Sequence, residues 1–147
     1  ACESGAARDS SAVVRGSVSG AGEIEAPVGR DPRSRTRMAV VGSGRPALTR
    51  YKVIRRFSNA TLLECSLSTG RTHQIRVHLQ SRGHPLLGDP VYVGSRGRQA
   101  AAAPIRRQAL HAARLEFVHP ASGEPRRFEA PLPEDIAALL ATLEAAR

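Results

Sequence analysis

Two runs of strand-forming residues on either side of a short polar turn constrain the fold of this chain more than any other feature. Residues 47–57 (ALTRYKVIRRF) alternate in part and are rich in strand formers, and residues 60–68 (ATLLECSLS) follow directly after Ser58-Asn59. Serine and asparagine suit a tight hairpin turn. A third strand pattern lies at residues 36–41 (TRMAVV), so the order predicts three successive strands in an antiparallel meander.

The rest of the chain adds a second hairpin and few helices. Residues 16–35 carry many glycines and prolines, which predicts a loop with at most a short extended piece. Residues 110–120 and 124–131 predict a hairpin. The tail, residues 133–146, has an amphipathic helical pattern whose apolar stripe consists of Ile136, Leu139, Leu140 and Leu143. The expected fold class is α+β, with an antiparallel-rich mixed sheet and few helices.

Length and charge bound the class of protein. A chain of 147 residues is long enough for one domain with a real core, and an aromatic content of 3% requires that core to be aliphatic. The formal net charge is +9, and all but one of the 22 basic residues are arginine. Because the guanidinium fork matches phosphate geometry, RNA, DNA or another polyanion is the expected partner. The alternative is codon bias, since alanine and arginine are both abundant.

Cysteine usage and hydropathy point to the cytoplasm. Cys2 and Cys65 form neither a disulfide framework nor a metal-binding pattern, and Cys65 alternates with Leu63 and Leu67, which predicts a buried, inert thiol. The sequence shows no signal peptide and no apolar run long enough to span a membrane. We therefore expect a cytoplasmic protein, and the sequence does not indicate its oligomeric state.

Residues 68–92 (STGRTHQIRVHLQSRGHPLLGDPVY) hold the densest group of hydrogen-bonding side chains. The pattern predicts a helix over 73–82, capped by Thr72 and ended by Gly83, with Ile75 and Leu79 facing the core. Arg71, Thr72 and His73 then lie beside the free backbone N–H groups of the helix start, a potential anion site. A second basic segment, 94–108, predicts a low-complexity loop.

Arg76 has three possible roles on local pattern alone. It can belong to a solvated helix face, or it can be half-buried beside Ile75 and require an anionic partner. Asp89 could be that partner, although Gly88-Asp89-Pro90 is more often simply a turn. Metal binding, a Ser-His-Asp hydrolase and nucleotide hydrolysis all lack their sequence signatures, so we expect no metal site and neither of these two activities.

The stretches TGRTHQIRVHL (69–79) and GHPLLGDPVY (83–92) resemble the third motif of the RluA-type family of ribosomal large-subunit pseudouridine synthases. The similarity extends from about Ala12 to the end of the chain. The resemblance implies the C-terminal portion of a pseudouridine synthase catalytic domain. The family converts uridine to pseudouridine in RNA without cofactor, through attack by an aspartate on a flipped uridine.

The resemblance also assigns residues. Arg76 matches the family position that pairs with the catalytic aspartate, holding it ionised and aimed. The motif residues expected to contact substrate or RNA are Arg71, Thr72, His73, Gln74 and Ile75. The resemblance implies RNA as the partner and favours that of the large ribosomal subunit, with no membrane and no metal.

The sequence departs from the family pattern at its start. No HRLD-type motif exists in these 147 residues, and Asp9, Asp31, Asp89 and Asp135 all lack its surroundings. Ser10 stands where the family has a tyrosine. We therefore expect residues 1–11 to be an unmatched, disordered leader or a junction, and residues 12–147 to be the C-terminal part of the catalytic domain.

Two hypotheses follow. The first is a pseudouridine synthase present as a fragment that lacks its nucleophile, so that this chain alone is inactive and Arg76 is exposed or loosely paired. The alternative is a non-catalytic basic RNA-binding module built on the same fold. Retention of an aspartate-pairing arginine favours the first.

Overall fold

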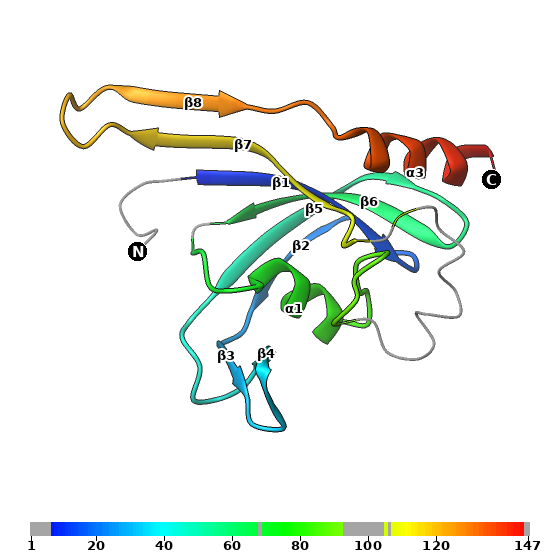
Figure 1. Ribbon diagram of the computed structural model, residues 1–147, viewed down its shortest axis with the longest axis horizontal. Coiled ribbons are helices and arrows are strands. Elements are labelled where there is room, and N and C mark those ends of the chain that lie inside the picture. Colours follow the sequence, from blue (N-terminus) through cyan, green and yellow to red (C-terminus); the bar gives the residue numbers. More distant parts are fainter. Residues whose placement is uncertain (1–6, 68, 93–104, 106, 146–147) are drawn as a thin grey trace.

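The computed structural model describes residues 7–67, 69–92, 105 and 107–145. Its main feature is a six-stranded antiparallel sheet with the order β2-β5-β6-β1-β7-β8 (Figure 1). Its strands are β1 (Ala7–Arg15), β2 (Ala21–Glu25), β5 (Leu48–Arg56), β6 (Ala60–Leu67), β7 (Leu110–Val118) and β8 (Pro125–Glu129). A separate sheet consists of β3 (Val28–Asp31) and β4 (Ser34–Val40), and the helices are α1 (Gln74–Ser81) and α3 (Glu134–Ala145). This confirms the predicted α+β class, and each strand pair among the described residues is antiparallel.

Both predicted hairpins are present. Strands β5 and β6 pair across Ser58-Asn59, where the Phe57 N–H donates to the Ala60 carbonyl at 2.8 Å. Strands β7 and β8 form the second hairpin, a ribbon that projects beyond the rest of the sheet (Figure 1). The predicted three-strand meander is wrong at its first strand, because β4 pairs with β3 in the small sheet.

The start of the chain is more ordered than its sequence indicates. Strand β1 begins at Ala7 and lies between β6 and β7, and Ser10 is buried within it. The expectation of a disordered leader is therefore wrong for residues 7–11. Because β1 pairs with a strand on each side, its backbone N–H and C=O groups are hydrogen-bonded whatever its side chains are. Asp9 also accepts hydrogen bonds from the side chains of Ser66 and Arg114.

The predicted loop over residues 16–35 is also largely wrong. This segment holds β2, which pairs with β5, and β3, which pairs with β4. The segment forms strands because its few apolar side chains enter the core, where Ile24 and Val28 are almost completely buried. Of the basic segment predicted as a loop at 94–108, only residues 105, 107 and 108 lie within the described part of the chain.

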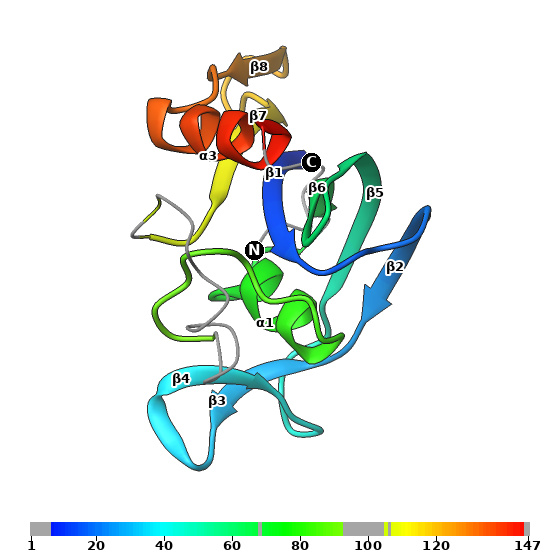
Figure 2. The same cartoon turned by 90° about the vertical axis from the view of Figure 1, so that its right-hand side faces the viewer.

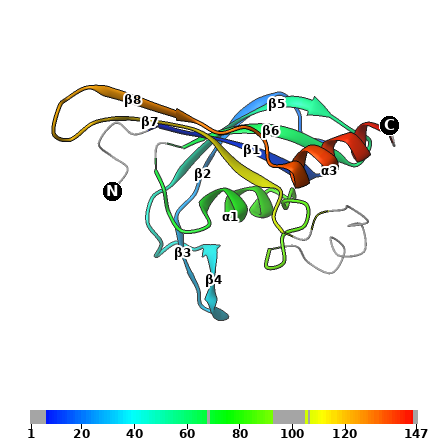
Figure 3. The ribbon, with the colours of Figure 1, turned by 45° about the horizontal axis from the view of Figure 1, so that its top comes forward.

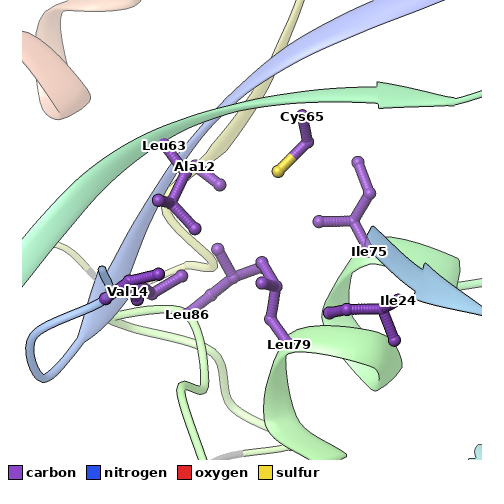
Figure 4. Close-up of a cluster of buried hydrophobic side chains, with 9 residues drawn as sticks. Ala12, Val14, Ile24, Leu63, Cys65, Ile75, Leu79 and Leu86 are labelled. Carbon is purple, nitrogen blue, oxygen red and sulfur yellow. The ribbon is translucent and has the colours of Figure 1, made fainter. Parts of the chain in front are cut away.

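The core has two main parts, one on each face of the large sheet. Alternate residues of β1 point to opposite faces, so Ala12 and Val14 pack toward α1 whereas Val13 packs toward α3. Figure 4 shows the α1 side, where Ile75 and Leu79 meet the sheet. Figures 2 and 3 show the two helices apart, with α3 near the C-terminus.

Two smaller predictions about the core are confirmed. Cys65 is fully buried, and burial raises the pKa of its thiol to about 12, so the thiol is inert at neutral pH. The tail forms the expected amphipathic helix α3, with Ile136 and Leu139 buried. Within the described residues, neither helix is long and apolar enough to cross a bilayer.

Candidate active site

Helix α1 begins at Gln74, one residue later than predicted, and the Gln74 side chain holds the loop before it in place. The N-cap residue is His73, with the left-handed φ of 55°, and no side chain caps the helix, so the prediction of a Thr72 cap is wrong. The Gln74 side-chain oxygen instead accepts from the Thr69 hydroxyl at 2.8 Å and from the Arg71 N–H at 3.0 Å. These bonds fix the loop that carries Arg71, Thr72 and His73.

The helix ends as predicted. Gly83 has a φ of 81°, its N–H donates to the Gln80 carbonyl, and the His84 N–H donates to the Leu79 carbonyl. This pair of bonds is the Schellman motif that a left-handed glycine permits. The chain then runs antiparallel beside the end of β1, where Leu86 bridges to Val14, before it reaches Gly88.

The central feature of the site is a buried, bidentate ion pair between Arg76 and Asp89. Arg76 Nε lies 2.9 Å from one Asp89 oxygen, and Arg76 Nη2 lies 2.8 Å from the other. The backbone N–H groups of Val91 and Tyr92 also donate to Asp89. Burial acts to raise the pKa of Asp89, but the bonds from Arg76 and the two N–H groups hold it below its ordinary value. The same pairing, foremost the hydrogen bond to Asp89, raises the pKa of Arg76.

The expectation that Arg76 is exposed or loosely paired is therefore wrong. The residue is only 8% exposed and its fork is matched within this chain. Gly88 is the physical reason, because its φ of 73° turns Asp89 back onto the helix. A Cβ at this position would lie 2.2 Å from the Arg107 carbonyl oxygen, so only glycine fits. Asp89 is thus both a turn residue and the partner of Arg76.

The pair with Asp89 uses only part of the hydrogen-bonding capacity of Arg76. A guanidinium has five N–H donors, and within the described residues Arg76 directs two of them at Asp89. Within the same residues, no hydrogen bond is formed at its Nη1 group.

Two further residues, Tyr92 and Arg37, belong to this site, and the sequence reasoning missed both. The Tyr92 ring is buried, and the guanidinium carbons of Arg76 and Arg37 lie 5.0 and 5.2 Å from its centroid. The Met38 N–H donates to the Tyr92 oxygen at 2.9 Å. The available signal was weak, since Tyr92 is one of only two tyrosines and Arg37 lies in an otherwise ordinary strand pattern.

His73 connects the helix start to Tyr92. Its Nδ1 lies 2.8 Å from the Tyr92 oxygen, and the two rings meet edge to face at 5.6 Å. Burial, and then the nearby charge of Arg76, lowers the pKa of His73. The Tyr92 oxygen accepts from Met38, and its hydroxyl can donate to His73 when Nδ1 of the neutral ring carries no proton.

The predicted site residues fall into two groups. Thr72 and His73 are exposed and Arg71 is half-buried, all on one loop. Gln74 and Ile75 are only 2% and 5% exposed, where Gln74 organises the loop and Ile75 fills the core. Their assignment to RNA contact stays a prediction.

Comparison with known proteins identifies the family. Residues 11–81 match the family model described as RNA pseudouridylate synthase. The ribosomal large subunit pseudouridine synthase D of Nitrosomonas europaea is 57% identical over 132 residues, which are 88% of this chain and 38% of that protein. The chain belongs to the RluA-type pseudouridine synthase family.

Further relatives agree with this assignment. A protein of the same name from Neisseria meningitidis is 51% identical over 90% of this chain and 37% of its own length. The solved structure of human RNA pseudouridylate synthase domain containing 1 superimposes with a TM-score of 0.75 and 25% identity, covering 95% of this chain and 66% of that one. The chain spans about two fifths of the length of the curated relatives.

The family match places the site within the pseudouridine synthase fold. The matched segment, residues 11–81, extends from within β1 to the end of α1 and so includes Arg76. Asp89 and Tyr92, which hold Arg76 in place, follow directly after the matched segment.

Proposed function

We propose that this chain forms the Arg76 side of an RNA pseudouridine synthase active site, and that the attacking aspartate comes from outside these 147 residues. The observation that carries the proposal is the orientation of Arg76: Asp89 holds its Nε and Nη2 groups, and among the described residues no hydrogen bond is formed at its Nη1 edge. In the reaction that the family implies, this edge would bind the aspartate that attacks the flipped uridine.

The aspartates of this chain support an external nucleophile. Asp89 accepts four hydrogen bonds, from Arg76 and from two backbone N–H groups. Asp9 is bound by Ser66 and Arg114, and Asp135 forms a bidentate pair with Arg107. Asp31 accepts from the Arg33 N–H at the tip of the β3–β4 hairpin. Each of the four already has a structural role.

RNA of the large ribosomal subunit is the proposed substrate. The relatives are named as ribosomal large subunit synthases, and a net charge of +9 favours a polyanion. The reaction needs neither a cofactor nor a metal. A buried free thiol and an RNA substrate favour the cytoplasm.

One observation favours a second candidate, a non-catalytic RNA-binding module. Arg76 already has a carboxylate partner within this chain, so its retention does not require an external aspartate. A module of this kind would use the same basic surface without chemistry.

The two candidates are separated by supplying the missing segment. The part of the Nitrosomonas europaea relative that lies outside the matched 132 residues, where the family resemblance implies the HRLD-type motif, is fused ahead of β1. Pseudouridine in large-subunit RNA is then mapped by chemical probing. The fusion is expected to form pseudouridine, whereas the 147-residue chain and the fusion with Arg76→Ala are not. Turnover by the chain alone would exclude an external nucleophile. A folded fusion that binds RNA without forming pseudouridine would favour the binding module.

A further inference from the structure

A cavity of about 600 Å³ lies between the small β3–β4 sheet and the loop before α1. Its lining residues come from β3, from β4 and the turn after it, and from residues 70–72. Three arginines line it, namely Arg30, Arg45 and Arg71, and no carboxylate does so among the described residues. Charged side chains of one sign that line a cavity favour a ligand of the opposite charge, so this lining favours an anion.

The shape of the cavity is fixed by backbone contacts. Val28 and Arg45 exchange two hydrogen bonds of 2.9 Å, which hold the turn after β4 against β3. A Cβ on Gly44 would lie 2.5 Å from the Val28 carbonyl carbon, so the turn can lie this close only with glycine. Arg71 Nε donates to the Pro46 carbonyl at 3.0 Å, which ties this turn to the loop before α1.

These contacts hold the guanidinium of Arg71 and the backbone of Arg45 beside the cavity. Arg71 is anchored through Nε, so its two Nη groups can bind an anion without further ordering of the side chain. Arg45 is exposed, and both its backbone N–H and its carbonyl bond to Val28. Both residues line the cavity, and the planar guanidinium fork of arginine suits a phosphate.

The remaining surface of the cavity is partly apolar and continuous with the candidate active site. Val28 and Met38 lie among the lining residues. The Met38 N–H donates to Tyr92, and the neighbouring Arg37 reaches the Tyr92 ring. Strand β4 therefore contributes Met38 to the cavity and contacts Tyr92, which lies beside Arg76.

We propose that this cavity binds a nucleotide that flanks the target uridine, with Arg45 and Arg71 on one backbone phosphate and Met38 against the sugar or base. The proposal rests on the proposed function and adds a subsite to it. Guanidinium and apolar groups do not discriminate between base edges in this arrangement, so the subsite positions the strand and does not read its sequence.

The test uses binding of fluorescein-labelled RNA hairpins, with two different loop sequences, to the 147-residue chain over a range of KCl concentrations. Arg45→Ala/Arg71→Ala is compared with Arg82→Ala/Arg126→Ala, which removes the same charge at the far end of α1 and on β8. The cavity variant is expected to weaken both hairpins by a similar factor, about tenfold, from the loss of a charged hydrogen-bonding site. It should also reduce the slope of log K against log salt by about 0.7, the value for one phosphate of a single strand.

Folding and function are controlled separately. Arg45→Gln alone removes one guanidinium without disturbing the bond between Arg71 and Pro46, and it should give a smaller loss in the same direction with an unchanged thermal midpoint. Equal effects of the cavity and control variants would overturn the subsite, because only the overall charge would then matter.

The fusion described above separates this proposal from the proposed function. In an active fusion, Arg45→Ala/Arg71→Ala should raise KM for RNA and leave kcat nearly unchanged. An active fusion whose KM is unchanged would refute the subsite alone. An inactive parent fusion whose RNA binding still depends on Arg45 and Arg71 would refute the synthase and retain the subsite.

Discussion

The Thr49 hydroxyl donates a 2.7 Å hydrogen bond to Nδ1 of His78, and both side chains are completely buried. Nε2 of the same ring lies 2.9 Å from the Ala26 carbonyl oxygen, so the proton of the neutral ring is on Nε2. Thr49 also accepts from the Gln74 amide at 3.1 Å. The chain of bonds therefore runs from the β2–β3 connection through the core to the residue that organises the start of α1.

This network predicts that stability falls at mildly acidic pH. Burial, which is the largest cause, lowers the pKa of His78 from its ordinary value of 6.5. Below pH 6.5 the unfolded chain binds a proton that the folded chain does not, so the free energy of unfolding decreases as pH falls toward the folded-state pKa. Urea unfolding at a series of pH values measures this slope.

The control for that slope is His73, whose pKa is also lowered but which is exposed. His78→Gln should remove more of the acid sensitivity than His73→Gln, because His78 has the more deeply buried ring. An unchanged pH dependence in His78→Gln would show that other groups cause it.

Substitution of Gly88 should destabilise the protein more than substitution of Gly83. Both glycines have left-handed φ values, 73° and 81°, so alanine costs about 1 kcal/mol of backbone strain at either. At Gly83 no atom lies within 4 Å of the new Cβ, whereas at Gly88 it would meet the Arg107 carbonyl. Gly88→Ala should therefore lose at least about 2 kcal/mol in urea unfolding, since the turn must move. Equal losses would mean that the turn relaxes freely.

Asp89 should be essential for the fold around Arg76. Removing one partner of a buried ion pair leaves an uncompensated charge and typically costs about 3–5 kcal/mol. Asp89→Asn is expected to lose much of this in urea unfolding, while Asp135→Asn, at a solvent-exposed pair with Arg107, should lose much less. Similar losses at the two positions would contradict a special role for the Arg76–Asp89 pair.

The sequence predicted the elements with strong local patterns. The β5–β6 and β7–β8 hairpins and helix α3 have regular apolar spacing and clear turns, and all three are present. Strand β1 was missed because its first residues are polar, and their order comes from pairing with two distant strands. Strands β2 and β3 were missed because glycine and proline outweighed the two buried side chains, Ile24 and Val28.

The site was predicted only in part, because some of its residues lie in one local motif and others depend on long-range packing. The motif located Arg76 and the loop of Arg71 to His73, since all lie within one short segment. The contribution of Arg37 depends on how the separate β3–β4 sheet packs beside α1, which local pattern does not specify. The choice between Asp89 as a turn residue and as a partner required the backbone conformation at Gly88.

Arg76 provides the sharpest test of the proposed chemistry. In a full-length relative, alanine at the position that corresponds to Arg76 should abolish turnover and leave RNA affinity nearly intact, because one charge among many contributes little to binding. The loss of the guanidinium removes the group that would keep the attacking aspartate ionised and aimed. Lysine should also be poor, since a point charge cannot hold Asp89 with one edge and a second carboxylate with the other.

The measurement is single-turnover kinetics combined with RNA affinity. Because Arg76→Ala also leaves Asp89 buried without its partner, the thermal midpoint must be measured, and Arg76→Lys serves as the variant that keeps a charge beside Asp89. A folded variant whose RNA affinity and turnover fall in the same proportion would identify Arg76 as a phosphate contact. Loss of turnover at unchanged affinity is the expected result, and it would place the guanidinium at the reacting carboxylate.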